Sequence, residues 1–268
     1  MDKSMVTLTI VTITYNDLSG LKRTVQSVME ERTSDIELLI IDGNSTDGTK
    51  EYLGTLIEKD DIQVISENDD GIYDAMNKGL RYASGRWVFY LNAGDTFLPG
   101  VVRPLIDRLK ISGSYDAIYG DVILTTMYNG QIYYRPEKAD RELSHLKKGM
   151  ICSHQGIICK REQIIRLGGF DTSFRIAGDW DLISRMYCAG GRFDHIDSYI
   201  AAYDRDGISA KPHIMERHRV RKNNRFYRIV DLYLIKDLIH ATKSVLSSMI
   251  LGNRKRALSI RLKRFQKS

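Results

Sequence analysis

Residues 1–95 alternate between short apolar runs and stretches in which apolar residues recur every three or four positions. Runs of β-branched and aliphatic residues are typical of strands that are buried on both faces of a parallel sheet. The predicted strands are residues 6–14, 36–41, 62–66 and 87–91. A helix is predicted after each of the first three strands, because apolar residues recur there at helical spacing. The first helix is capped by Asp17 or Ser19, and the other two cover residues 49–58 and 72–83. This order predicts right-handed crossovers and an open α/β sheet.

After residue 95 the pattern changes and predicts a mixed sheet. Strands are expected at residues 117–122, 154–159 and 196–203, a hairpin at Asn129-Gly130 and a helix over residues 179–189. No linker separates the two halves of the chain. We therefore expect one domain over residues 1–210, with a nucleotide-binding half (1–95) and a half that shapes the substrate site (96–210).

The remaining residues, 211–268, differ from the domain in charge. Residues 1–210 hold 24 Lys and Arg against 31 Asp and Glu, a net charge of −7, whereas residues 211–268 hold 16 against 3, a net charge of +13. Such asymmetry indicates an anionic partner, either nucleic acid or an acidic membrane surface. The sequence predicts a basic helical tail there with an aliphatic stripe. The stripe comprises Ile229, Leu232, Leu234, Ile235, Leu238 and Ile239.

Composition places the chain among ordinary globular proteins, because 43% of its residues are hydrophobic. The three cysteines, Cys152, Cys159 and Cys188, form no CxxC pair, so we expect reduced thiols in a cytoplasmic protein rather than a disulfide framework. The N-terminal residues lack the pattern of a signal peptide, and no uncharged apolar run approaches the ~20 residues that span a bilayer.

Three acidic loops follow predicted strands, at residues 41–48, 68–71 and 91–95. In open α/β sheets, ligands bind beyond the carboxyl ends of the strands. Carboxylates gathered there, without the glycine fingerprint of a dinucleotide site, favour a nucleotide diphosphate that is held through a divalent cation. This combination indicates transfer chemistry on an activated sugar.

Residues in the first two loops have both a binding and a structural interpretation. Thr14, Tyr15 and Asn16 follow the first strand where a base or ribose would lie, but polar residues there also form ordinary turns. Asp42 ends an apolar strand, where an ionised carboxylate needs a donor or a cation. The imino N–H of a pyrimidine is one such donor. The alternative is an Asx turn built by Asp42 and Asn44.

The third loop and the helix after residue 177 carry the candidate chemistry. Asp95 is suited to hold a hard divalent ion against a diphosphate, although it could equally cap the next element. Asp179 is the candidate general base, which would take the proton of an acceptor hydroxyl in an inverting transfer. Trp180 offers a flat face for sugar stacking or for core packing. His154 and Gln155 form a further polar cluster, with acceptor or donor contact and simple packing both open.

Five segments in order, TITYN, ELLIIDGNSTDGT, DDGIYDAMNKGL, GRWVFYLNAGD and AGDWDL, resemble the family 2 glycosyltransferases of the GT-A fold. In that fold a Rossmann-like nucleotide-binding half is fused to a mixed-sheet acceptor half. The resemblance covers residues 6 to about 210 and is strongest to bacterial enzymes of O-antigen, capsule and exopolysaccharide repeat units. It implies a catalytic base at Asp179 and contact of Asp95 with metal and diphosphate. It also implies nucleotide-sugar contacts from Thr14, Tyr15, Asn16, Asp42, Asp70, Asn77, Asn92 and Asp95.

One departure from the family concerns the metal motif, which is usually Asp-x-Asp followed by a further Asp. Here these positions are Asn92, Gly94 and Asp95, so a single carboxylate survives. Dependence on Mn²⁺ or Mg²⁺ is still expected, with more of the ion's shell supplied by phosphate and water.

The expected activity is that of an inverting hexosyltransferase. It would move a hexose from a nucleotide sugar, with UDP expected, to a saccharide on a polyprenyl diphosphate at the cytoplasmic face of the membrane. The basic tail would provide peripheral membrane contact, because its basic residues alternate with aliphatic residues. Binding of nucleic acid is disfavoured, because the tail has few aromatic residues for base stacking. Alternatives are a nucleotidyltransferase, disfavoured because Tyr15-Asn16-Asp17 replaces a glycine-rich basic loop, and a non-catalytic protein that binds nucleic acid or an anionic surface.

Overall fold

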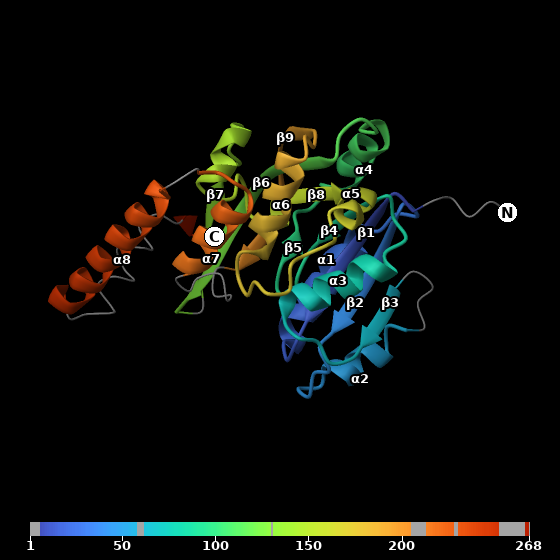
Figure 1. The fold of residues 1–268 in the computed structure, drawn as a ribbon. Coiled ribbons are helices and arrows are strands. Elements are labelled where there is room, and N and C mark those ends of the chain that lie inside the picture. The colour runs from blue at the N-terminus through green and yellow to red at the C-terminus, as the bar shows by residue number, and fades with distance from the viewer. Residues whose placement is uncertain are drawn as a thin grey trace.

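The computed structural model describes residues 6–57, 62–129, 131–204, 213–227, 230–251 and 266–267. Figure 1 shows a central sheet with helices on both faces. The strands are β1 (Leu8–Thr14), β2 (Ile36–Asp42), β3 (Ile62–Ser66), β4 (Trp87–Tyr90), β5 (Thr96–Phe97), β6 (Ala117–Tyr128), β7 (Gln131–Glu137), β8 (Ile157–Lys160), β9 (Phe193–Asp204) and β10 (Gln266–Lys267). The helices are α1 (Leu18–Glu30), α2 (Thr49–Gly54), α3 (Ile72–Tyr82), α4 (Val102–Ile111), α5 (Arg161–Arg166), α6 (Gly178–Cys188), α7 (Ile214–Asn223) and α8 (Leu232–Leu251), with 3₁₀ turns η1 (Leu143–Lys147) and η2 (His154–Gly156).

The first four strands pair in parallel in the order β3-β2-β1-β4, as the sequence predicted. Their side chains alternate between two core clusters. Along β1, Leu8 and Ile10 face the cluster that contains Leu21 of α1, whereas Val11 faces the cluster that contains Met76 of α3. The strands are therefore buried on both faces, which explains why they are apolar throughout. Asp17 caps α1 by accepting a hydrogen bond from the Gly20 amide at 2.9 Å.

Beyond β4 the sheet becomes mixed and continues through β8, β6, β7 and β10. β6 and β7 form the predicted antiparallel hairpin; Gly130 of its turn lies outside the described residues. The predicted strand over residues 154–159 needs a correction. Its first three residues form the 3₁₀ turn η2, because the Gly156 amide donates to the Ser153 carbonyl at 2.8 Å, and strand pairing begins at Ile157.

The position of β1 fixes where a ligand can bind. β2 and β3 lie on one side of β1, whereas the chain returns to place β4 on the other side. The loops that leave the carboxyl ends of β1 and β4 therefore diverge and open a crevice between them. This is the switch point at which ligands bind in open α/β sheets.

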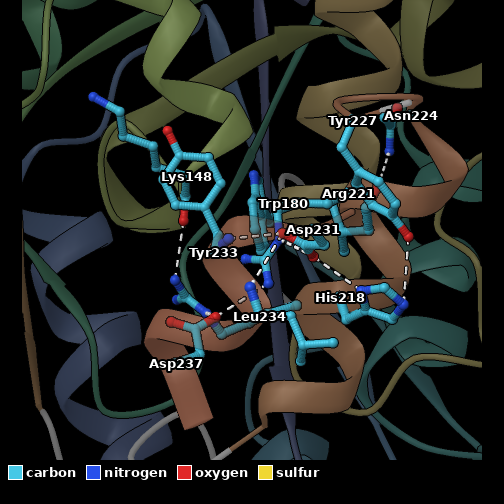
Figure 2. Close-up of polar contacts among 12 residues, drawn as sticks. Lys148, Trp180, His218, Arg221, Asn224, Tyr227, Asp231, Tyr233, Leu234 and Asp237 are labelled. Atoms are coloured by element: carbon cyan, nitrogen blue, oxygen red, sulfur yellow. Dashed lines mark hydrogen bonds and ion pairs between the residues drawn. The ribbon is translucent and has the colours of Figure 1, made fainter. Parts of the chain in front are cut away.

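Helix α7 packs into the domain, although the sequence placed the domain's end at residue 210. Val220 and Arg221 have no exposed surface, and Val220 belongs to the same core cluster as Trp180 of α6. The Arg221 guanidinium pairs with Asp231 at 2.7 Å and with Asp237 at 3.1 Å (Figure 2). The core of the domain thus includes part of the segment that the sequence predicts as a tail.

Helix α8 projects from the body of the molecule, on the side opposite β2 and β3 (Figure 1). Four residues of the predicted stripe, Leu232, Ile235, Leu238 and Ile239, are 46–65% exposed, whereas Leu234 is partly buried. Ile229 lies outside the described residues. In the described part of the chain, no helix is long and apolar enough to cross a membrane.

Candidate active site

A cleft of about 1150 Å³ opens at the carboxyl ends of β1 and β4. It is large enough for a ligand bigger than a typical drug-sized molecule. Seven of the residues that the sequence singled out line it: Thr14, Tyr15, Asn92, Asp95, His154, Gln155 and Asp179. The structure thus joins residues from positions 14 to 179 in one crevice.

The loop after β4 is anchored by hydrogen bonds to Thr24 of α1. The Thr24 hydroxyl donates to the Asp95 carbonyl at 2.7 Å and accepts from the Gly94 amide at 3.0 Å. Gly94 has φ +95°, a left-handed conformation that favours glycine. This anchoring turns Asp95 inward, where its side chain is buried and accepts a hydrogen bond from Gln155 Nε2 at 2.8 Å.

The buried carboxyl group of Asp95 needs a nearby positive charge to stay ionised. Burial raises its pKa to about 7, against the opposing effect of the Gln155 hydrogen bond. A buried carboxylate stays ionised most readily beside a cation. Nearby, the buried Asn92 Oδ1 has no hydrogen-bond partner among the described residues. These two oxygen ligands suit a hard divalent ion. The described residues contain no cluster of three His, Cys, Asp or Glu, so substrate oxygens and water would have to complete its shell.

Asp179 lies in the first turn of α6 and faces the same cleft. Its carboxylate accepts from the Trp180 amide at 2.7 Å and from the Tyr73 hydroxyl at 3.4 Å. His154 connects Asp179 to the β4 loop, because its Nδ1 lies 3.8 Å from Asp179 Oδ2 and its Nε2 lies 3.1 Å from Asn92 Nδ2. Burial lowers the pKa of His154 despite the nearby Asp179 charge, so the ring is neutral at pH 7.

At the other end of the cleft, the 67% exposed Tyr15 ring and the Asp69 carboxylate lie over Gly43. A Cβ on residue 43 would lie 2.5 Å from an Asp69 oxygen and 3.2 Å from a Tyr15 ring carbon, so a larger residue there would displace both side chains. Asn16 stabilises the loop beside them, since its Oδ1 accepts from the Thr46 amide at 2.8 Å. Asn16 therefore supports the cleft and is not among the residues that line it.

Three further predicted contacts lie away from the cleft lining. Asp42 is fully buried and accepts from the Ser45 amide at 3.2 Å and from the Ser66 hydroxyl at 2.6 Å, which matches the turn interpretation. The Asn77 amide group pairs with both the N–H and the carbonyl of Phe170 at 2.9 Å. Asp70 is exposed, and its neighbour Asp69 lines the cleft instead.

Trp180 is a correction to the sugar-stacking interpretation. Its side chain is 3% exposed, and its Nε1 donates to the Leu146 carbonyl at 2.7 Å. The guanidinium carbons of Arg217 and Arg221 lie 5.4 Å and 5.8 Å from its ring centroid. Trp180 is a core residue between α6 and α7 and offers no face to the cleft.

The structure also adds residues that sequence reasoning missed. The hairpin formed by β6 and β7 contributes Arg135, Glu137 and Lys138, whereas Arg23 of α1 and Arg175 of the loop before α6 reach the cleft from separate elements. The Arg23 guanidinium lies 3.7 Å from the position that a Cβ on Gly94 would take. No spacing along the chain marks these residues, because only the tertiary fold brings their elements to the cleft.

Comparisons with known proteins define the class of this chain. The model of the family described as glycosyl transferase family 2 matches residues 9–168. The chain therefore belongs to glycosyl transferase family 2 and is a glycosyltransferase, not the nucleotidyltransferase that was kept as an alternative.

Individual relatives agree with this assignment. An uncharacterized glycosyltransferase of Mycobacterium tuberculosis strain H37Rv is 33% identical over 188 residues, which cover 68% of this chain and 69% of the relative. A PGL/p-HBAD biosynthesis glycosyltransferase of Mycobacterium bovis BCG is 29% identical over 209 residues, covering 74% and 77%. The succinoglycan biosynthesis protein ExoO of Rhizobium meliloti is 22% identical over 290 residues, covering 90% and 81%.

Solved structures confirm the GT-A fold. The S. aureus TarS structure with UDP-GlcNAc aligns with a TM-score of 0.64 at 15% identity, covering 87% of this chain and 71% of that chain. The mannosyltransferase PcManGT of Pyrobaculum calidifontis, in complex with GDP-Man and Mn²⁺, aligns with a TM-score of 0.61 at 17% identity, covering 95% and 78%.

Proposed function

We propose that this glycosyltransferase moves a hexose from a UDP-sugar to a lipid-linked saccharide, with inversion at the anomeric carbon. The observation that carries the proposal is the arrangement of Asp179, His154, Asn92 and Asp95 along one cleft. The candidate base and the candidate diphosphate site are thereby joined through one neutral imidazole. An inverting transfer needs its base and its diphosphate site at different places in the cleft, because the acceptor attacks the anomeric carbon opposite to the departing diphosphate.

The side chains divide the reaction between them. Tyr15 and Asp69 would bind the base and ribose end of the donor at the Gly43 surface. Asp95 and Asn92 would hold a Mn²⁺ or Mg²⁺ ion, which offsets the charge of the diphosphate when bound. Asp179 would accept the proton of the acceptor hydroxyl as its oxygen bonds to the anomeric carbon and the bond from that carbon to the diphosphate breaks. The Tyr73 hydroxyl, whose pKa is raised by burial, would stay protonated and orient Asp179.

The identities of donor and acceptor rest on similarity. The names of two relatives refer to the biosynthesis of succinoglycan and of PGL/p-HBAD, and one structural neighbour is a complex with UDP-GlcNAc. These names support a nucleotide-sugar donor and a role in glycan biosynthesis. We place that role at the cytoplasmic face of the membrane, where a lipid-linked acceptor would be presented. No nucleic-acid partner is part of the proposal.

The role of Asp179 is tested by Asp179→Asn, which keeps the shape of the side chain and removes the base. We expect turnover to fall about a hundredfold or more while the affinity for UDP stays unchanged. Turnover is measured as UDP release with acceptor present, and affinity by titration calorimetry. A variant that turns over at the normal rate would remove Asp179 from the mechanism.

The metal site is tested by Asp95→Ala. Because Asp95 is the carboxylate that the cleft offers to an ion at this loop, the variant should bind UDP more weakly in Mn²⁺ and should lose the difference between Mn²⁺ and EDTA. The control is Asp107→Ala, which removes an exposed carboxylate of α4. Equal UDP affinity of the unmodified protein in Mn²⁺ and in EDTA would contradict a functional metal site.

The donor end is tested by two adjacent substitutions of the same kind. Asp69→Asn should weaken UDP binding about tenfold, because Asp69 lines the cleft beside Tyr15. Asp70→Asn should leave UDP binding unchanged, because Asp70 is exposed and is not among the cleft residues. The opposite order of the two affinities would restore Asp70 as the nucleotide contact.

We further propose peripheral membrane association through residues 211–268. The described residues support an apolar surface for it: the exposed side chains of Leu232, Ile235, Leu238 and Ile239 on a helix that projects from the domain. The predicted basic contacts, which lie outside the described residues, are Arg254, Lys255, Arg256, Arg261, Lys263 and Arg264. Each surface-adjacent basic residue adds about 1 kcal/mol of attraction to anionic lipid.

Flotation with vesicles that contain anionic lipid tests this association. The full chain should float at low salt and should be released at high salt, whereas a chain that ends at Gly252 should float poorly. Ile235→Ser with Leu238→Ser should also weaken flotation, while Ile111→Ser, which changes an exposed isoleucine of α4, should not. Salt-independent flotation, or flotation that survives the truncation, would show that the tail is not the membrane contact.

A further inference from the structure

The carboxylate of Glu216, on helix α7, binds three consecutive backbone amides in the loop before α6. Oε1 accepts from the Arg175 amide at 2.8 Å, and Oε2 accepts from the amides of Ile176 and Ala177 at 2.9 Å each. Burial acts to raise the pKa of Glu216, but the three amide donors outweigh it and hold the pKa below its usual value. The carboxylate is therefore ionised at neutral pH and serves as the common acceptor for this loop.

The clamped loop leads directly to the candidate base. Ala177 is the N-cap of α6, and Asp179 follows two residues later. The Ile176 carbonyl accepts from the Tyr73 hydroxyl at 2.6 Å, and the same hydroxyl lies 3.4 Å from Asp179 Oδ1. Gly178 packs on the Tyr73 ring so closely that a Cβ there would lie 2.7 Å from a ring carbon. The backbone at residues 176–178 and the direction of Asp179 are thus set together.

Helix α7 can act as a rigid support because its other contacts are buried. Val220 and Arg221 have no exposed surface. Arg221 is paired with Asp231 (Figure 2). The Asp231 carboxylate also accepts a hydrogen bond from His218 Nδ1 at 2.9 Å. The Trp180 ring, next to Asp179 in sequence, lies beside Arg217 and Arg221 of α7.

We propose that Glu216 is a positioning residue for the transfer reaction: it fixes the loop at residues 175–177 and thereby holds Asp179 and the acceptor side of the cleft in place. This inference rests on the proposed role of Asp179 as the base. Arg175 and Ile176 line the cleft themselves, so the clamp also shapes the surface that an acceptor meets. The donor end at Tyr15 and Asp69 lies on other elements.

The test compares Glu216→Gln, which keeps the length of the side chain but loses the charge and half of its acceptor capacity, with Glu216→Ala and with Lys222→Gln as control. Lys222 is an exposed residue of the same helix. We expect kcat to fall about tenfold in Glu216→Gln and further in Glu216→Ala, while the Kd for UDP changes less than twofold. Lys222→Gln should match the unmodified enzyme. Unchanged kcat in both Glu216 variants would overturn the proposal, as would an equal loss of UDP affinity.

Two measurements separate positioning from a general loss of structure and from failure of the proposed function. Hydrogen exchange should be faster at the amides of residues 175–177 in Glu216→Gln than in Lys222→Gln, with other protected amides unaffected. In the Asp179→Asn background, Glu216→Gln should not lower kcat any further, because Glu216 acts on the reaction through Asp179. An additive loss in that background would overturn the proposal. A normal rate for Asp179→Asn alone would instead overturn the role of Asp179 as the base.

Discussion

The parallel pairing of β1 with both β2 and β4 is the constraint on which the site depends. It places the carboxyl ends of three strands at one edge of the sheet, and it makes the loops after β1 and β4 diverge. The strands must be apolar on both faces to be buried in this position, so polar residues are confined to their ends. Asp42, Asn92 and Asp95 mark these ends, which is why strand prediction and site prediction draw on the same sequence signal.

The sequence was sufficient for the parts of the fold that follow local rules. The strand at Ile62–Ser66 has the predicted bounds, and the cap at Asp17 and the β6–β7 hairpin form as expected. The 3₁₀ turn at His154 was missed because it runs directly into the apolar residues Ile157 and Ile158 of β8, and the Gly156 hydrogen bond that defines the turn leaves no mark in the sequence. The positions of Arg23 and Arg175 in the cleft follow from long-range packing, which no local pattern records.

The polar residues near strand ends show why candidate sites are only partly predictable. Asp42 and Asp95 have the same residue type, similar loops and complete or nearly complete burial. Asp42 meets three donor groups, from Ser45 and Ser66, whereas Asp95 accepts from the Gln155 side chain and from the backbone amides of Asp204 and Asn92. At Asp95 burial outweighs these donors and raises the pKa to about 7, so the ionised form of this carboxyl is the one that gains from a cation. This difference depends on the neighbours that the fold supplies and not on the motif itself.

The C-terminal helices combine two environments that composition alone had merged into one basic tail. Arg221 is a basic residue without exposed surface, and its partner Asp231 is also buried, so removing either charge would disrupt a buried network that also includes Asp237 and His218. By contrast, Leu232, Ile235, Leu238 and Ile239 of α8 are exposed, which is the reverse of ordinary packing. The ion pair between Arg221 and Asp231 joins α7 to the start of α8. Glu216, also on α7, binds the loop before Asp179. The exposed apolar surface of α8 is therefore linked to this loop through contacts of α7. A contact made by α8 outside the domain would therefore act on a helix that binds the loop before Asp179.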